Sequence, residues 1–249
     1  MANVSGSAPA GIPASYRPDA RSSRDRSKGS IVGGGAWGNR VFAASVGAFY
    51  DWAMHNELVG SGYLRLIVGD RRQGLLGAMD AVAEMPDGTS ILDVPCGGGI
   101  TLGKLLPGQR VRYVATDISP AMLHRARRQV RSQSVATVEF VECDITAMPF
   151  DDNAFDLIVC FSGLHCLPDP AAAVSEMARC LRPGGRLIAD VALHGQLRRT
   201  DAFMSVGRAA GIFGPPALLA DVRRWFCDAG LTINITREAG ALVYIEAHR

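Results

Sequence analysis

Short apolar runs rich in Val, Ile and Leu alternate with helical stretches from residue 90 to the end of the chain. Runs that are apolar at successive positions are typical of parallel sheets whose two faces are both covered by helices. They predict strands at 90–95, 111–116, 137–142, 154–161, 185–192, 230–237 and 241–248. Only Glu238-Ala239-Gly240 separates the last two, which is too short for a crossover helix, so this pair must be an antiparallel hairpin. We therefore predict an α/β fold built on a seven-stranded, mostly parallel sheet with helices on both faces.

Two helices between these strands have well-marked starts. Ser119 and Asp169 are each followed by proline, which places an N-cap residue before a proline at the first helical position. Pro183-Gly184-Gly185 is expected to end the second of these helices and turn the chain into the next strand. A shorter helix is expected to follow the glycines after residue 95 and to end near Leu106.

The first third of the chain divides into a tail and a helical segment. Residues 1–35 are rich in Ser, Pro and Gly with few large apolar side chains, so we expect a disordered tail. Residues 36–85 show apolar residues at helical spacing, with breaks expected near Gly60–Gly62 and Gly69, and predict an N-terminal helical cap. Residues 86–249 then form the main domain.

The charge balance gives no reason to expect nucleic acid as a partner. The 249 residues carry 26 basic and 24 acidic groups, a formal charge of +2. Five of the basic groups but only two of the acidic ones lie in the first 30 residues, so the rest of the chain is nearly neutral. The apolar stretches are shorter than the roughly 18 residues that cross a membrane. The oligomeric state cannot be read from the sequence.

Six cysteines show neither CxxC spacing nor a cluster with histidine of the kind that binds zinc. No metal site is therefore expected, and a reduced, cytoplasmic location is the simplest interpretation.

A glycine turn follows the first strand in the run Ile91-Leu92-Asp93-Val94-Pro95-Cys96-Gly97-Gly98-Gly99. In open α/β sheets, ligands bind beyond the carboxyl ends of the strands, and glycines there let the backbone approach a ligand. A dinucleotide fingerprint needs a further glycine three positions after Gly99, where this chain has Leu102. A nicotinamide cofactor is therefore disfavoured.

Three successive strands end near an acid: Asp93, Asp117 and Asp144. An anionic rim suits a ligand with a cationic ammonium or sulfonium group, a ribose and an adenine amino group. It suits a pyrophosphate poorly, because like charges repel.

Across roughly residues 85–249 the chain resembles the class I S-adenosylmethionine-dependent methyltransferases, in their small-molecule, ubiquinone/menaquinone methyltransferase-like branch. The resemblance implies a Rossmann-like fold and S-adenosyl-L-methionine as cofactor. It rests on five stretches in the family's order: Asp93–Gly99, Asp117–Leu123, Asp144-Ile145, Phe155–Cys160 and Leu181–Gly185.

The resemblance also implies roles for individual residues. The glycine turn would contact the methionine and ribose moieties, and its acid would help to hold the amino group. The second acid would bind the ribose hydroxyls and the third the adenine amino group. The implied cofactor-binding residues are Asp93, Pro95, Cys96, Gly97, Gly99, Asp117, Ile118, Asp144, Ile145, Phe161 and Ser162.

Two further residues are candidates for catalysis. His165 follows the fourth strand and could deprotonate a phenolic acceptor, whose free pKa is about 10. Tyr50 lies in a Tyr-Asp pair that resembles the helical lid of this branch. His165-Cys166 stands where quinone-type relatives often have two histidines, which weakens any transfer of the acceptor's identity.

The sequence therefore predicts a methyltransferase for a small apolar or aromatic acceptor, with O- or C-methylation favoured over N-methylation. Cofactor binding without turnover, in a regulatory or assembly role, stays open as an alternative. A nucleic-acid methyltransferase is less well supported, because Cys160–His165 lacks the Asn/Asp-Pro-Pro-aromatic tetrad used on the exocyclic amines of bases.

Overall fold

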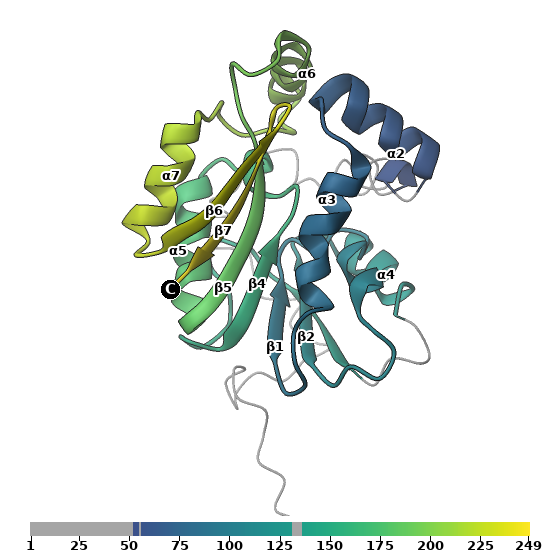
Figure 1. Cartoon of the computed structure of the whole chain (residues 1–249), viewed down its shortest axis with the longest axis vertical. Coiled ribbons are helices and arrows are strands. Elements are labelled where there is room, and N and C mark those ends of the chain that lie inside the picture. The colour runs from purple at the N-terminus through teal and green to yellow at the C-terminus, as the bar shows by residue number, and fades with distance from the viewer. Residues whose placement is uncertain (1–51, 55, 131–135) are drawn as a thin grey trace, which may run out of the picture.

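The computed structural model describes residues 52–54, 56–130 and 136–249. Its centre is one seven-stranded sheet in the order β3-β2-β1-β4-β5-β7-β6 (Figure 1). The strands are β1 (Ser90–Asp93), β2 (Arg112–Asp117), β3 (Thr137–Glu142), β4 (Phe155–Cys160), β5 (Leu181–Ala192), β6 (Thr232–Ala239) and β7 (Leu242–His248). Strand β7 pairs antiparallel with both β5 and β6, whereas β1 to β5 pair in parallel. This confirms the predicted sheet, including its reversed C-terminal strand.

The helices lie on both faces of the sheet, and Figure 1 shows α3 in front of β1 and β2 and α5 behind the sheet. The α-helices are α2 (Glu57–Tyr63), α3 (Arg72–Met79), α4 (Pro120–Arg127), α5 (Pro170–Cys180), α6 (Arg198–Ala209) and α7 (Leu219–Asp228). The shorter helices are η3 (Leu64–Val68), η4 (Asp80–Val82), η5 (Thr101–Lys104) and η6 (Leu164–Cys166). As predicted, Ser119 and Asp169 are the N-cap residues of α4 and α5.

Side chains of each strand alternate between two apolar cores. On β5, Leu187, Ala189 and Val191 face a core that contains residues of α5 and α7. Ile188 and Ala192 face the other core, to which η3, α3, α4 and α6 contribute. The same alternation places Asp190, between Ile188 and Ala192, on the side of this second core.

Three predictions about the helices are wrong. Pro183-Gly184-Gly185 does not end the second capped helix, because α5 ends at Cys180 and β5 already begins at Leu181. The chain does not break near Gly60–Gly62, because α2 runs through both glycines and ends in η3. Gly60 is needed for space: a Cβ there would lie 2.9 Å from the carbonyl oxygen of Ala53. The helix expected to reach Leu106 is only the four-residue η5, since Leu105 already has extended backbone angles. The break at Gly69 is confirmed, with a left-handed φ of 83°.

The turn at Gly69 is held by contacts from distant parts of the chain. The tip of the β6–β7 hairpin lies against it: Ala241 N donates to the Val68 carbonyl, and Gly240 has no space for a side chain there. Thr200 of α6 donates its hydroxyl to the Ile67 carbonyl. The helical segment that precedes the sheet is thus fixed to the sheet's C-terminal part.

The predicted tail, residues 1–35, and the start of the predicted cap lie outside the described residues. The boundaries at 35 and 85 therefore remain predictions. Among the residues that the structure describes, no helix is long and apolar enough to cross a membrane.

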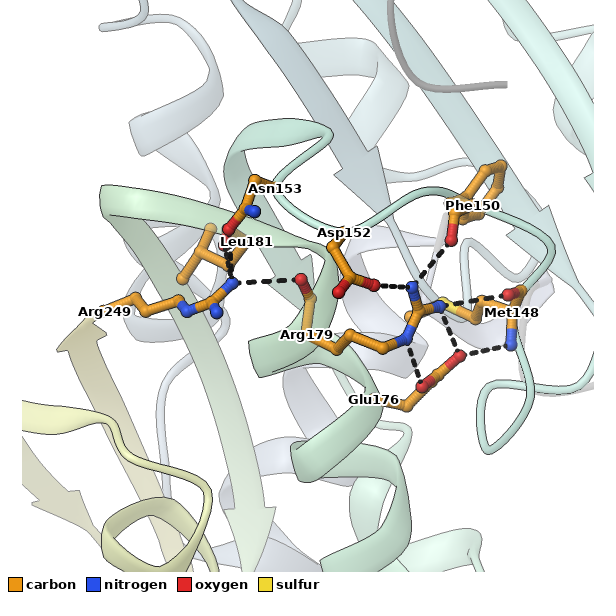
Figure 2. Close-up of polar contacts among 8 residues, drawn as sticks. All are labelled: Met148, Phe150, Asp152, Asn153, Glu176, Arg179, Leu181 and Arg249. Atoms are coloured by element: carbon orange, nitrogen blue, oxygen red, sulfur yellow. Dashed lines mark hydrogen bonds and ion pairs between the residues drawn. The ribbon is translucent and has the colours of Figure 1, made fainter. Parts of the chain in front are cut away.

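Arg179 of α5 holds the loop between β3 and β4 (Figure 2). Its guanidinium donates to the carbonyl oxygens of Phe150 and Met148 and to the carboxylates of Asp152 and Glu176. Glu176 also accepts the backbone N–H of Met148 at 2.9 Å. The loop that begins with Asp144 is therefore fixed at its far end by one ion-pair network.

Candidate functional site

The carboxyl ends of β2, β1, β4 and β5 lie next to one another in the sheet. Because these strands are parallel, the residues that end them meet at one edge. Asp117 ends β2, Asp93 ends β1, Phe161 and Ser162 follow β4, and Asp190 lies near the end of β5. The structure thus brings together most of the residues implied by the resemblance.

The glycine turn after β1 is anchored to β2. Cys96 donates its backbone N–H to the Thr116 carbonyl at 2.7 Å, and Gly97 donates to Oδ2 of Asp117 at 3.0 Å. Gly97 and Gly99 both have left-handed backbone angles, with φ of 51° and 89°, which favour glycine. A Cβ on Gly99 would lie 2.9 Å from Cα of Ala126, so this glycine also lets α4 approach the turn.

Asp117 is buried at the end of β2 and accepts two backbone hydrogen bonds. Gly97 N donates to Oδ2, and Ser119 N donates to Oδ1 at 2.8 Å. Burial raises its pKa to about 6, although both hydrogen bonds act in the opposite direction. Each carboxylate oxygen keeps a second lone pair, which suits the two hydroxyls of a ribose. The side chain of Ile118 beside it is 38% exposed, a large apolar surface available to an adenine ring.

Asp93 is buried beneath the turn. The hydroxyl of Tyr113 donates to its Oδ2 at 2.7 Å. Burial raises the pKa of Asp93 to about 7, and the charge of Asp117 adds to this rise. The predicted contact of Asp93 with the methionine amino group remains a prediction.

Asp144 begins the loop after β3. Its Oδ1 accepts both the backbone N–H and the hydroxyl of Thr146, which fixes the carboxylate's orientation. Ile145 is 7% exposed and belongs to the core that contains residues of α5 and α7. Little of its side chain is therefore available to a ring stacked on it. Their predicted contacts with adenine remain predictions.

The loop after β4 touches the loop after β1. A Cβ on Gly163 would lie 2.4 Å from Cδ of Pro95, so only glycine permits this approach. The preceding residue, Ser162, has a left-handed φ of 55°, an unusual conformation for a residue other than glycine, asparagine or aspartate. Its backbone N–H donates to Oδ1 of Asp190. Backbone strain of this kind is concentrated at functional sites.

His165 lies in η6, where its Nδ1 accepts the backbone N–H of Ala192 at 3.4 Å. That contact places the proton of the neutral ring on Nε2. Enclosure by the surrounding protein lowers the pKa of His165 to about 4. Its role as a base remains a prediction. Tyr50 lies outside the described residues.

Sequence reasoning missed Asp190. Asp190 lies in the run Leu187-Ile188-Ala189-Asp190-Val191-Ala192. The apolar pattern of this run predicts a strand covered on both faces. A single acid in such a strand is itself a signal, because a buried carboxylate is costly unless it is paired or used.

The reversed seventh strand, the glycine turn after β1 and the acid that ends β2 together define the class I, S-adenosylmethionine-dependent methyltransferase fold. Residues 92–189 match the family model described as a methyltransferase domain, so this part of the chain is similar to that family. S-adenosylmethionine is the cofactor of this class, and the anionic rim with its two left-handed glycines fits that cation.

Curated relatives match part of the chain. The chain is 36% identical to the demethylmenaquinone methyltransferase of Clavibacter sepedonicus over 140 residues, 55% of each chain. It is 38% identical to the ubiquinone/menaquinone biosynthesis C-methyltransferase of Hahella chejuensis over 104 residues, 41% of this chain and 42% of the relative. The matches thus span about half the length of these relatives. A SAM-dependent methyltransferase structure from Aquifex aeolicus shares the fold with a TM-score of 0.53 and 22% identity, over 74% of this chain and 92% of that one.

Proposed function

We propose that this protein transfers the methyl group of S-adenosylmethionine to a ring carbon of a quinol, the reduced form of a quinone. The supporting observation is the edge of the sheet where the glycine turn, Asp117 and the Ser162 loop meet. The similarity to a demethylmenaquinone methyltransferase and to a ubiquinone/menaquinone biosynthesis C-methyltransferase supports the acceptor class.

The chemistry of the transfer favours the reduced acceptor. A methyl sulfonium is an electrophile, so its partner must be rich in electrons. A quinol ring, activated by two hydroxyl groups, meets that need, whereas the oxidised quinone is itself an electrophile. We therefore expect turnover with the quinol and none with the quinone.

The chain's own residues bind and align the reactants. Asp117 is held by two backbone N–H groups and offers its remaining lone pairs to a diol. Alignment of two reactants in a site closed to water supplies much of the acceleration in such a displacement. The contact between Gly163 and Pro95 fixes the loop after β4, which we expect to border the methyl donor, relative to the glycine turn.

Calorimetry with S-adenosylmethionine, its demethylated product and NAD tests the cofactor. We expect binding of the first two and no binding of NAD; tight NAD binding alone would overturn the assignment. A transfer assay with methyl-labelled donor then tests the acceptor, using a short-chain demethylmenaquinol, a simple phenol and a fatty acid. Label in the ring carbon of the quinol supports the proposal. Cofactor binding without transfer to any acceptor would instead favour the binding-protein alternative.

A further inference from the structure

We propose that Oδ2 of Asp190 accepts the hydroxyl proton of the methyl acceptor, which makes Asp190 the catalytic base. This inference rests on the proposed function and assigns a role to a residue that sequence reasoning missed.

The geometry of the Asp190 carboxylate singles it out. The residue is 0% exposed, and its Oδ1 accepts the backbone N–H of Ser162. Among the described residues, its Oδ2 has no hydrogen-bond partner. A buried oxygen without a partner costs free energy, of the order of 1–3 kcal/mol or more for a charged group. A hydroxyl from a bound acceptor would provide the missing donor.

Asp190 lies beside the loop that follows β4. Ser162 belongs to the loop expected to border the methyl donor, and a single hydrogen bond joins this loop to Asp190. Asp190 also faces the core against which Tyr63 of α2 packs. Burial raises the pKa of the Tyr63 hydroxyl, and the charges of Cys166 and Asp190 add to the rise. The carboxylate therefore lies between the loop beside the donor and the helical segment before the sheet.

A row of aromatic rings extends from this point. Tyr63 and Phe203 of α6 lie edge to face with centroids 5.8 Å apart, and Phe203 is 5.7 Å from Phe213. Phe213 is in turn 6.0 Å from the ring of His165. Flat faces of this kind suit an aromatic acceptor. Phe203 is 39% exposed, so the row reaches the surface.

The surroundings of Asp190 keep its charge poorly stabilised. Burial raises its pKa to about 7, and the neighbouring carboxylate of Asp70 adds to the rise. The other titratable groups that face it within the described chain are Tyr63 of α2, Cys160 of β4, Cys166 of η6 and Tyr244 of β7. All four are neutral near pH 7, since burial raises the pKa of each. A base with a pKa near the working pH is well suited to proton transfer.

The reaction balances with this base. The acceptor's hydroxyl proton passes to Oδ2 while a ring carbon forms the new bond to the methyl group. The methyl–sulfur bond breaks, and its electron pair remains on sulfur. The methylated carbon then loses its hydrogen as a proton to water, and Asp190 returns the first proton to the acceptor oxygen. One proton is released in total.

Asp190 is better placed for this step than His165. Nδ1 of His165 already accepts the Ala192 N–H, so Nε2 carries a proton and can only donate. In this geometry His165 can hydrogen-bond to the acceptor oxygen, while Asp190 removes the proton.

The test compares Asp190→Asn with Asp228→Asn, which changes an exposed acid at the end of α7. Transfer to a short-chain demethylmenaquinol is measured from pH 5.5 to 8.5, with calorimetry of the demethylated cofactor product. We expect kcat of Asp190→Asn to fall about 10²–10⁴-fold, with product affinity changed less than about threefold. In the wild type kcat should rise with pH to a plateau, with a midpoint near pH 7. Asp228→Asn should keep both properties.

Two measurements do not depend on the Asn variant being active. Asp70→Asn removes a negative neighbour of Asp190. The pH range over which kcat rises (the rising limb of the pH profile) should therefore lie at lower pH in this variant than in the wild type. Infrared titration of the ligand-free protein should show buried carboxyl absorption near pH 7 from both Asp93 and Asp190. Asp190→Asn should remove one of the two contributions, and Asp228→Asn should retain both. An Asp190→Asn variant that keeps kcat within fivefold, or an Asp70→Asn limb that does not move, would overturn the base role alone. A wild type that transfers no methyl group would refute the proposed function and the base role together.

Discussion

Gly163 lies against the ring of Pro95 so closely that a Cβ on the glycine would be 2.4 Å from Cδ of the proline. The two residues belong to the loops after β4 and β1. Their contact sets the spacing of the two segments that would lie on either side of the methyl donor.

Gly163→Ala should therefore force these loops apart. Overpacking of this kind typically costs about 1–3 kcal/mol, and the affinity for S-adenosylmethionine should fall as well. Gly77→Ala in α3 is the matched control, since nothing lies within 4 Å of its added Cβ. That variant should be neutral or more stable by up to about 1 kcal/mol. Chemical denaturation and calorimetry measure both effects, and equal behaviour of the two variants would contradict the prediction.

Asp117→Asn should weaken cofactor binding while the fold is retained. The change removes a negative charge that accepts two backbone N–H bonds and, in our interpretation, the ribose hydroxyls. Hydrogen bonds to charged groups contribute about 1.5–3 kcal/mol, so Kd should rise roughly 10–100-fold. Asp87→Asn is the control, because Asp87 also accepts a backbone N–H, from Arg110, but lies before the amino end of β1. An unchanged Kd for Asp117→Asn would remove this residue from the binding site.

Asp93→Asn should change how stability depends on pH. The pKa of Asp93 is raised from 3.8 to about 7, so between these values the folded state binds more protons than the unfolded state. The stabilisation that the Asp93 carboxyl contributes is present at low pH and is lost as the pH rises toward 7. It amounts to about 1.4 kcal/mol for each unit by which folding raises the pKa. Asn does not ionise and can still accept the Tyr113 hydroxyl. In thermal unfolding of the ligand-free proteins, the stability of Asp93→Asn relative to the wild type should therefore increase from pH 5 to pH 8. A stability difference that stays constant over this range would contradict the prediction.

Arg179→Met should destabilise the protein and loosen the loop that begins with Asp144. It leaves the carbonyls of Met148 and Phe150 without the guanidinium donors shown in Figure 2, and Glu176 keeps only the backbone N–H of Met148. We expect a loss of about 1–3 kcal/mol. The matched change Arg224→Met removes an exposed arginine that pairs with Asp221 on α7, and it should cost less than about 0.5 kcal/mol. Denaturant titration distinguishes the two, and a similar small loss in both would show that the network contributes little.

Most of the strands were predictable because they are short apolar runs bounded by turn residues. The helical segment before the strands was less predictable. Gly60 looks like a helix break in the sequence, yet in the structure it serves a close approach to Ala53, a contact that the local pattern does not contain. The glycine turn and Asp117 were predictable for a different reason, since the ends of neighbouring parallel strands must meet.

Asp190 could not be placed in the same way. Its role depends on which face of β5 it occupies and on its hydrogen bond to Ser162, 28 residues away in the sequence. Both follow from the register of β5 against β4. Periodicity indicates that a strand is buried, but the partners of a buried acid come from the tertiary arrangement.

The position of β7 has a consequence for biosynthesis. This strand is made after the other six, yet it lies between β5 and β6. Until it leaves the ribosome, β5 has an open edge, and β6 has no neighbour to pair with. Unpaired edges can recruit strands from other chains. The nascent protein is therefore most exposed to aggregation just before residues 242–248 emerge.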